Sequence, residues 1–196
     1  TKFGLIIADV SDKGLAASLY MTVSRTLLRA VSQEFTSPAR ALERVNQLLQ
    51  LDSSQSFFVT LIYLILDTAT GELSYCIAGH NPPYLLDSAT NSAQKLNMGG
   101  IALGLLDPIK LSDEFLQLKS GQSLFLYTDG ISEPANEDGL QFGSLHLPKC
   151  LELNAGKEPE IVISAIKKEL NAYLQGRPIE DDYTMLVLKR NDLLTD

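Results

Sequence analysis

The sequence has few cysteines and fewer basic than acidic residues. Its two cysteines, Cys76 and Cys150, lie in apolar or amphipathic stretches without CxxC spacing, so neither a disulfide framework nor a zinc site is predicted. Its 16 Lys and Arg against 24 Asp and Glu give a net charge of -8. That sign is wrong for a protein that neutralises nucleic-acid phosphates or anionic lipid. We expect a protein or small-molecule partner, no nucleic acid and no membrane, and the scarcity of cysteine favours a cytoplasmic location.

Long apolar runs are also absent from the sequence. No stretch of about 18 residues lacks a polar break, and the first residues do not combine a basic region with an apolar core. We therefore expect neither a membrane span nor a targeting signal. The 196 residues are 45% hydrophobic, which favours a single domain over residues 1–196 with a core of its own.

Two helices are predicted directly after a short first strand. Residues 3–8, FGLIIA, are typical of a strand buried on both faces. After Gly14 the apolar residues recur every four positions, which predicts a long amphipathic helix whose stripe belongs to the core: Leu15, Leu19, Val23, Leu27 and Val31. A second helix is expected from Ser37, a plausible N-cap, with Pro38 at the first helical position.

The middle and end of the chain are richer in strand patterns. FFVTLIYLILD and ELSYCIAGH, joined by TATG, predict a β-hairpin, and further strands are expected at PPYLLD, EFLQLK, SLFLYTD and YTMLVLKR around a loop over 97–113. Helices are expected at FGSLHLPKCLEL and PEIVISAIKKELNAYLQG, the second with Gly176 at its C-terminal cap and one face made by Ile161, Ala165, Ile166 and Leu170. This order indicates an α+β layered sandwich and argues against a repeated βαβ fold.

Aspartates stand at three places where a strand meets a loop. Asp9 ends the first strand, Asp129 ends SLFLYTD, and the pair Asp181 and Asp182 precedes the last strand. If these strands are neighbours, the carboxylates form a cluster that repels itself unless a cation neutralises it. Oxygen ligands without nearby histidine or thiolate favour Mg²⁺ or Mn²⁺. Taken singly, each aspartate is more often a turn residue, so both interpretations stay open at this point.

Several segments together resemble one protein family. ADVSDKGLAASLYM, FVTLIYLILDTATGELSYCIAGHNPPYLL, GGIALGLLD, LFLYTDGISEPANEDGLQFG and DDYTMLVLKR occur in the order and approximate spacing of the bacterial PPM-type (PP2C-like) serine/threonine phosphatases of the SpoIIE/RsbU group. The resemblance extends over nearly the whole chain. Its specificity comes from the joint occurrence of the DVSxKG, AGHNPP, YTDG and DDxT elements.

The resemblance implies a fold, a reaction and a set of ligands. The fold would be an αββα four-layer sandwich, and the reaction would be hydrolysis of a phosphoserine or phosphothreonine by water that two Mn²⁺ or Mg²⁺ ions activate. Asp9 would bridge the two ions and the Val10 carbonyl would add an oxygen ligand. Asp129 and Asp181 would complete the site. Asp182 stands where relatives carry Asn, so it ranks below Asp181.

The resemblance also implies partners and shows one departure. Relatives commonly act on an anti-sigma-factor antagonist with a STAS-like fold, under the control of upstream sensory or receiver domains, and a homodimer is compatible with this arrangement. The family pattern begins with a GGDxYD-like strand that supplies another metal-ligating aspartate, whereas only eight residues precede Asp9. We therefore expect an N-terminally truncated piece of a longer regulatory protein, with an incomplete metal site and an exposed sheet edge.

The sequence is compatible with two other functions. A catalytically impaired interaction module of a partner-switching pathway would keep the fold. Asp9, Asp129 and Asp181 argue against it, because a pure scaffold would not need them, whereas the expected loss of the first strand argues for it in this chain. A response-regulator receiver, which LIIADVSDKG also resembles, should continue as alternating strands and helices. Two consecutive helices followed by consecutive strands argue against it.

The remaining polar candidates have less specific patterns. His80 is either a general acid, because histidine titrates near neutrality, or a turn residue bonded to the backbone, and the second reading is favoured. Asp12 is expected to be a solvated loop charge, and Glu133 and Asn136 to shape the loop after YTDG. His146 is assigned no role.

Overall fold

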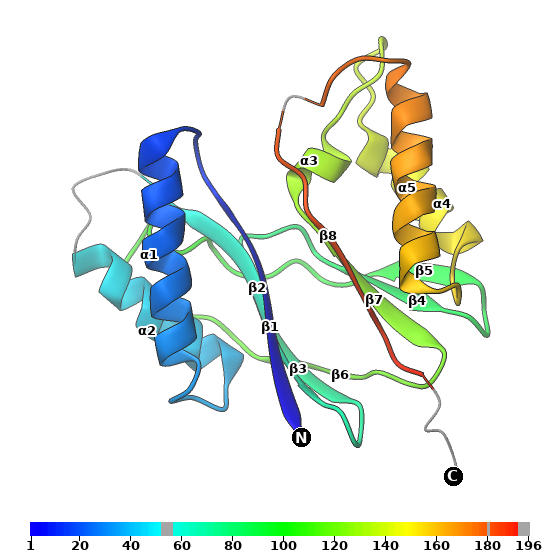
Figure 1. Ribbon diagram of the computed structural model, residues 1–196. Helices are drawn as coiled ribbons and strands as arrows, with labels where there is room; N and C mark the ends of the chain where they lie inside the picture. Colours follow the sequence, from blue (N-terminus) through cyan, green and yellow to red (C-terminus); the bar gives the residue numbers. More distant parts are fainter. Residues whose placement is uncertain (52–56, 180, 192–196) are drawn as a thin grey trace. The chain divides into compact units, whose positions relative to one another are not determined.

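The computed structural model describes residues 1–51, 57–179 and 181–191, and the chain within it forms two compact units. Unit 1 consists of Thr1–His80 and Met98–Gln117, and unit 2 consists of Asn81–Asn97 and Leu118–Asp196. The chain therefore leaves unit 1, returns to it and leaves it again. Each unit contains one four-stranded antiparallel sheet together with helices (Figure 1).

Unit 1 is built on a sheet with the strand order β1-β2-β3-β6. Helices α1 and α2 pack on one face of it, where Leu28 and Val45 meet Leu61 and Cys76 in a buried cluster (Figure 1). The strong hairpin pattern is confirmed, because β2 and β3 pair antiparallel around the predicted turn. The elements of unit 1 are β1 (Lys2–Val10), α1 (Leu15–Val31), α2 (Pro38–Leu51), β2 (Val59–Asp67), β3 (Glu72–Ala78) and β6 (Glu114–Gln117).

Unit 2 is built on a second antiparallel sheet, with the order β5-β4-β7-β8. Helices α4 and α5 cover one face, where Leu147 and Ile166 pack with Phe125 and Tyr127 of β7. The short strand β5 and the one-turn helix α3 were not predicted. The elements of unit 2 are β4 (Tyr84–Asp87), β5 (Ser92–Lys95), β7 (Gln122–Tyr127), α3 (Asp129–Ser132), α4 (Phe142–Leu153), α5 (Pro159–Leu174) and β8 (Met185–Lys189).

Helix α2 anchors the segment over 97–113, which was predicted to be a loop and forms no helix or longer strand in the structure. Asn46 is fully buried, its Nδ2 donates to the Leu106 carbonyl at 2.8 Å, and its Oδ1 accepts from the Gly104 N–H at 2.9 Å. The Leu111 N–H donates to Glu43 Oε1 at 2.9 Å. Side chains of α2 therefore supply hydrogen bonds that a segment without regular structure cannot supply itself.

The prediction that the first strand is buried on both faces is wrong. Ile7 is the one buried residue of β1, and β1 stands at the end of its sheet with β2 as its strand neighbour in the described part of the chain. A run of apolar residues does not by itself distinguish an edge strand from a central one.

The predicted core stripe of α1 is also wrong over its first half. Leu15, Leu19 and Val23 are 78%, 59% and 45% exposed, whereas Leu28 and Val31 are buried. A helix turns about 100° per residue, so a strict four-residue repeat advances about 40° at each step and winds around the helix. Residues at the two ends of such a stripe cannot all face one core.

The predicted buried face of α5 is also wrong at one residue. Ile161 is half exposed, and the buried face is made by Val162, Ile166, Leu170 and Leu174. The helix ends at Leu174 and its C-cap is Gln175, which adopts the left-handed conformation with φ 53°. Gly176, the expected cap, follows directly with φ 88°.

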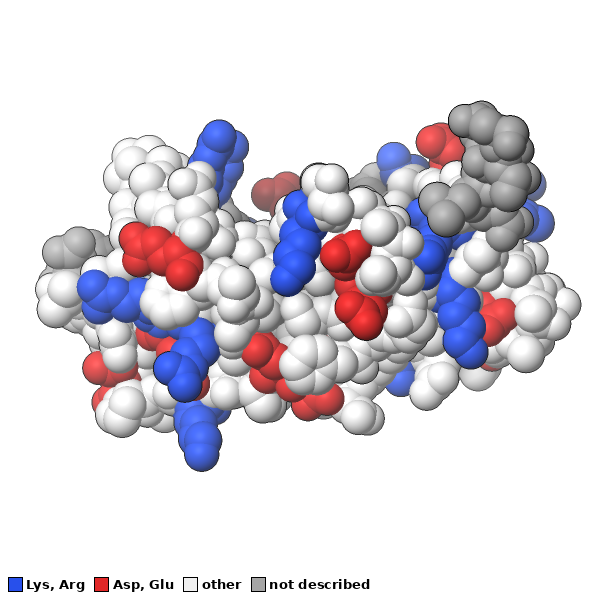
Figure 2. Space-filling model, turned by 90° about the horizontal axis from the view of Figure 1, so that it is seen from below, with Lys and Arg blue, Asp and Glu red and all other residues white. Residues whose placement is uncertain are grey.

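Charges of both signs are interspersed on the surface. On the face shown in Figure 2, the described basic side chains lie among acidic ones, so the acidic excess is not gathered there into one patch. Among the described residues, no helix is both long enough and apolar enough to cross a bilayer.

The burial pattern of α1 predicts opposite outcomes for the same substitution at two positions. Leu28→Ala should lower the free energy of unfolding by about 2–5 kcal/mol, because it leaves a cavity in the core. Leu19→Ala, on the exposed side of the same helix, should change it by less than about 0.5 kcal/mol. Urea unfolding followed by circular dichroism measures both, and equal losses would contradict the assignment of the buried face.

Candidate metal centre

The end of β7 and the start of β8 bring two acidic segments of unit 2 together. Tyr127 pairs with Met185 in the antiparallel ladder. Beyond it, the Thr128 N–H donates to the Thr184 carbonyl at 3.1 Å, and the Thr184 N–H donates to Thr128 Oγ1 at 2.9 Å. This pair of bonds holds the backbone just before Asp129 against the backbone just after Asp181 and Asp182.

Gly130 allows these two segments to approach closely. A Cβ atom at this position would collide with the carbonyl oxygen of Asp182. On the other segment, the Asp182 N–H donates to Asp181 Oδ1 at 2.9 Å, which fixes the Asp181 side chain relative to its own backbone. Gly130 is therefore required for close approach and not for an unusual backbone angle.

Glu133 is an acidic neighbour that the sequence reading assigned only to loop shape. Its N–H donates to the Asp129 carbonyl at 2.8 Å, so it stands one helical turn after Asp129. Burial, and then the charges of Asp129 and Asp181, raise the pKa of the Glu133 carboxyl. Glu133 follows the candidate ligand Asp129 by four residues in the sequence, and this spacing could have predicted that the two carboxyl groups lie close together.

Asp129 fits a cation on two counts. Its Oδ1 is buried and has no hydrogen-bond partner within the described residues, and burying a polar oxygen without a partner is costly. The surrounding donors are carboxylate oxygens, the ligands that Mg²⁺ and Mn²⁺ prefer. The described residues of either unit contain no ready-made group of three or more His, Cys, Asp or Glu that could hold a metal ion.

Asp9 and Val10 are the last two residues of β1 in unit 1. Asp9 pairs with Thr60 of β2, and beyond Val10 the Ser11 N–H donates to the Phe58 carbonyl at 2.9 Å while Ser11 Oγ accepts from the Phe58 N–H at 3.0 Å. The end of β1 is therefore held on both sides of Val10.

Asp12 belongs to the turn that follows β1. It is exposed, has φ 72°, and accepts at Oδ1 from the Lys13 N–H at 2.8 Å. Aspartate tolerates this left-handed conformation better than most side chains, which agrees with the expected loop charge.

The predicted ligands thus fall into two sets. Asp129, Asp181 and Asp182 lie together in unit 2, and Asp9 and Val10 lie in unit 1. The convergence of both sets on one metal centre stays a prediction.

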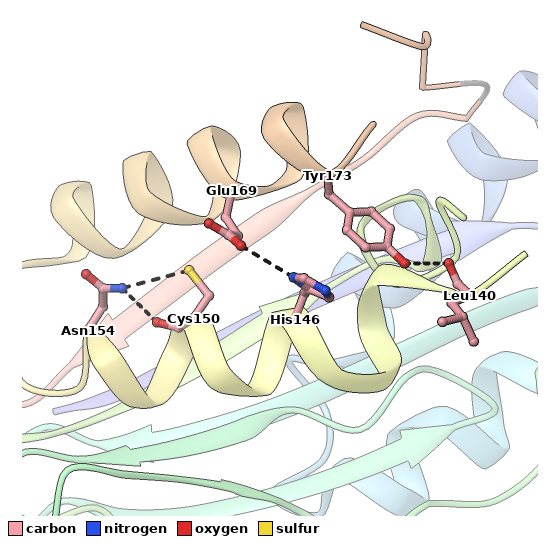
Figure 3. Close-up of polar contacts among 6 residues, drawn as sticks. All are labelled: Leu140, His146, Cys150, Asn154, Glu169 and Tyr173. Carbon is pink, nitrogen blue, oxygen red and sulfur yellow. Dashed lines mark hydrogen bonds and ion pairs between the residues drawn. The ribbon is translucent and has the colours of Figure 1, made fainter. Parts of the chain in front are cut away.

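A hollow in unit 2 lies away from these aspartates. It has a volume of about 360 Å³ and is formed between α4 and α5, with Cys150 and Asn154 among its lining residues. In Figure 3 the His146 side chain of α4 points to Glu169 of α5, with Nδ1 and Oε1 3.4 Å apart. None of the predicted metal ligands lines this hollow.

Neither cysteine has the environment of a reactive thiol. Asn154 Nδ2 donates to the Cys150 carbonyl at 2.7 Å (Figure 3), and burial, with the Glu169 charge, raises the pKa of the Cys150 thiol. Burial, with the charges of Asp113 and Glu43, raises the pKa of the Cys76 thiol to about 12.

The sequence and the fold match one family. The sequence model of the family described as "Stage II sporulation protein E (SpoIIE)" matches residues 1–191. The chain belongs to the SpoIIE family. It is 25% identical over 186 residues to phosphoserine phosphatase RsbU of Bacillus subtilis, which covers 95% of this chain and 55% of RsbU. The chain therefore spans only about half the length of this relative.

Solved structures show the fold of the SpoIIE family chain to be PP2C-like. The RsbU and RsbW domains of Rv1364c from Mycobacterium tuberculosis are 27% identical with a TM-score of 0.79, over 97% of this chain and 52% of that one. The SiaA-PP2C domain of Pseudomonas aeruginosa has a TM-score of 0.83 at 20% identity, over 96% and 80% of the two chains. The serine/threonine phosphatase PstP, solved with two manganese ions, has a TM-score of 0.62 at 14% identity, over 94% and 86%. The expected α+β, PP2C-like fold is confirmed.

The close approach at Gly130 leads to a stability prediction for this SpoIIE family chain. Gly130→Ala should lower the free energy of unfolding by roughly 1–3 kcal/mol, because the new methyl group must displace the Asp182 backbone. Gly4→Ala is the control, since its Cβ would lie 3.5 Å from the Tyr63 ring, an ordinary contact. Urea unfolding compares the two variants, and a Gly130→Ala variant as stable as the wild type would show that the junction is not tight.

The raised pKa values of the Cys76 and Cys150 thiols predict that both react slowly with disulfide reagents in the native protein. At about pH 8 an ordinary cysteine is partly ionised and reacts readily with a disulfide reagent such as DTNB. Cys76 and Cys150 should react slowly in the folded chain, and faster only as the pH rises well above the ordinary thiol pKa. Absorbance after mixing measures the rate, and the protein unfolded in guanidinium chloride is the control in which both thiols react. Rapid labelling of the native chain would contradict the burial.

Proposed function

We propose that this chain is a metal-dependent protein serine/threonine phosphatase. The observation that carries the proposal is the junction of unit 2. There, two bonds between Thr128 and Thr184 hold the segment of Asp129 beside the segment of Asp181, and Asp129 Oδ1 is buried without a hydrogen-bond partner among the described residues. Membership of the SpoIIE family, and the printed activity of RsbU as a phosphoserine phosphatase, support the same conclusion. We further propose that residues 1–196 act as one phosphatase domain.

The proposed ligands are those that the family resemblance implies. Asp9 would supply a carboxylate shared between the ions, and the Val10 carbonyl would supply a neutral oxygen. Asp129 and Asp181 would supply carboxylates from unit 2, and Asp182 is a weaker candidate because relatives carry Asn at its position. Divalent Mn²⁺ or Mg²⁺, when bound, supplies an activated water and stabilises charge on the phosphoryl oxygens.

The proposed substrate is a phosphoserine or phosphothreonine on a signalling protein, of the anti-sigma-factor antagonist type. The net charge of -8 does not favour binding to nucleic acid or anionic lipid, which is consistent with a protein substrate met in the cytoplasm. We also propose that an upstream sensory or receiver domain controls the phosphatase in the full-length protein, and that the protein forms a homodimer.

The proposed function predicts loss of hydrolysis when one ligand is neutralised. Asp129→Asn should lower Mn²⁺-dependent hydrolysis of p-nitrophenyl phosphate and of a phosphoserine protein by at least about 100-fold, because the side chain no longer carries the charge that holds the metal. The release of p-nitrophenol and of inorganic phosphate measures this.

Asp138→Asn is the matched control, since Asp138 is an exposed aspartate of the same unit outside the proposed site, and it should keep wild-type activity. Equal activity in the Asp129→Asn variant would overturn the catalytic proposal. A wild-type chain that hydrolyses neither substrate but binds the phosphoprotein would favour the interaction module.

A further inference from the structure

A hydrogen bond joins the side chain of Thr60 to the backbone of Asp9. The two residues are direct partners in the β1–β2 ladder, and directly opposed residues of an antiparallel pair project from the same face of the sheet. Thr60 Oγ1 donates to the Asp9 carbonyl oxygen at 3.3 Å. This bond adds a side-chain contact to the backbone ladder at the residue that carries the proposed bridging carboxylate.

His80 completes a chain of contacts behind Thr60. Its side chain is 3% exposed, and its Nδ1 lies 2.9 Å from Thr60 Oγ1. A threonine hydroxyl has one proton to donate. When that proton goes to the Asp9 carbonyl, the contact with Thr60 is a hydrogen bond only if His80 Nδ1 carries a hydrogen and donates it. In that arrangement His80 is in the tautomer with a hydrogen on Nδ1.

The two bonds restrict the side chain that contacts Asp9. Threonine rotates about a single bond, and without a second partner its hydroxyl could turn away from the Asp9 carbonyl. His80 is held at the end of the GELSYCIAGH hairpin strand, where the Gly79 N–H donates to the Gly100 carbonyl at 2.6 Å. Asp9 is thus linked through Thr60 to a separately anchored part of unit 1.

We propose that Thr60 and His80 are positioning residues that fix Asp9 and the adjacent Val10 carbonyl for metal binding. The inference rests on the proposed function, because it takes Asp9 and Val10 as ligands. Groups that orient metal ligands from behind commonly change metal affinity by about 10–100-fold when they are removed. His80 acts here through Thr60, so neither of the two earlier alternatives, a general acid or a plain turn residue, describes it fully.

The first test removes the hydroxyl without changing the size of the side chain. Thr60→Val should weaken Mn²⁺ binding, measured by isothermal titration calorimetry, by about 10-fold or more, and Thr60→Ser should restore it to within a few-fold of the wild type. Thr68→Val is the matched control at the other end of β2, where the hydroxyl donates to the Thr1 carbonyl at 2.9 Å, and it should leave Mn²⁺ affinity unchanged. Thermal unfolding without metal verifies that each variant is folded.

The second test replaces the histidine by amides of two lengths. His80→Asn places an amide N–H near the position of Nδ1 and should keep most of the Mn²⁺ affinity. His80→Gln places it near Nε2 and should behave like Thr60→Val. The proposed direction of the hydrogen bonds is wrong if His80→Asn and His80→Gln have the same Mn²⁺ affinity, whether both are weakened or both equal the wild type.

The tautomer itself gives a readout that needs no metal and no activity. The chain has two histidines, so a long-range ¹H–¹⁵N NMR spectrum recorded with a His146→Gln variant assigns the His80 ring. We expect a hydrogen on Nδ1 in the metal-free wild type and in Thr60→Ser. A spectrum with the hydrogen on Nε2 would overturn the inference.

The outcomes separate this inference from the proposed function. If the wild type binds Mn²⁺ and hydrolyses phosphoserine while Thr60→Val binds Mn²⁺ equally well, the positioning role is wrong and the phosphatase function stands. If Thr60→Val loses stability without losing Mn²⁺ affinity, the pair has only a structural role. A wild type that binds no Mn²⁺ would overturn the proposed function and the inference with it.

Discussion

The repulsion between like charges is the constraint on which the acidic junction of unit 2 depends. Carboxylates held near one another in a partly buried place cost free energy until a cation neutralises them, so something else must keep them there. In unit 2 the reciprocal bonds between Thr128 and Thr184 do this. One is a backbone bond and the other uses the Thr128 hydroxyl, so the acidic side chains need not hold themselves in place.

Most of the fold could be predicted from the sequence because its elements have strong local patterns. The hairpin of β2 and β3 and the two helices after Gly14 have the periodicities of their structures. The errors arose where tertiary context decides. SAQK has no apolar alternation and becomes β5 only by pairing with β4, and the exposed side of α1 depends on which part of a winding stripe meets the sheet.

The candidate site could be predicted only in part, for a related reason. Aspartates at strand ends are visible in the sequence, and the resemblance to a family gave them roles. Thr60 was not visible, because it lies inside a strand pattern that is read as packing, and it acts on a residue 51 positions away. Glu133 was missed because a glutamate after a turn has many ordinary uses. Contacts between distant segments have no local signature, so sequence periodicity cannot report them.

The passage of the chain between its two units has a consequence for the order of folding on the ribosome. Unit 1 needs β6, which follows the first excursion of the chain into unit 2. A nascent chain therefore cannot finish its N-terminal unit until residue 117 has left the exit tunnel, although domains usually fold from the N-terminus as they are made. Until then, the edge of β3 that faces away from β2 is unpaired, and a chaperone or a second nascent chain could bind there.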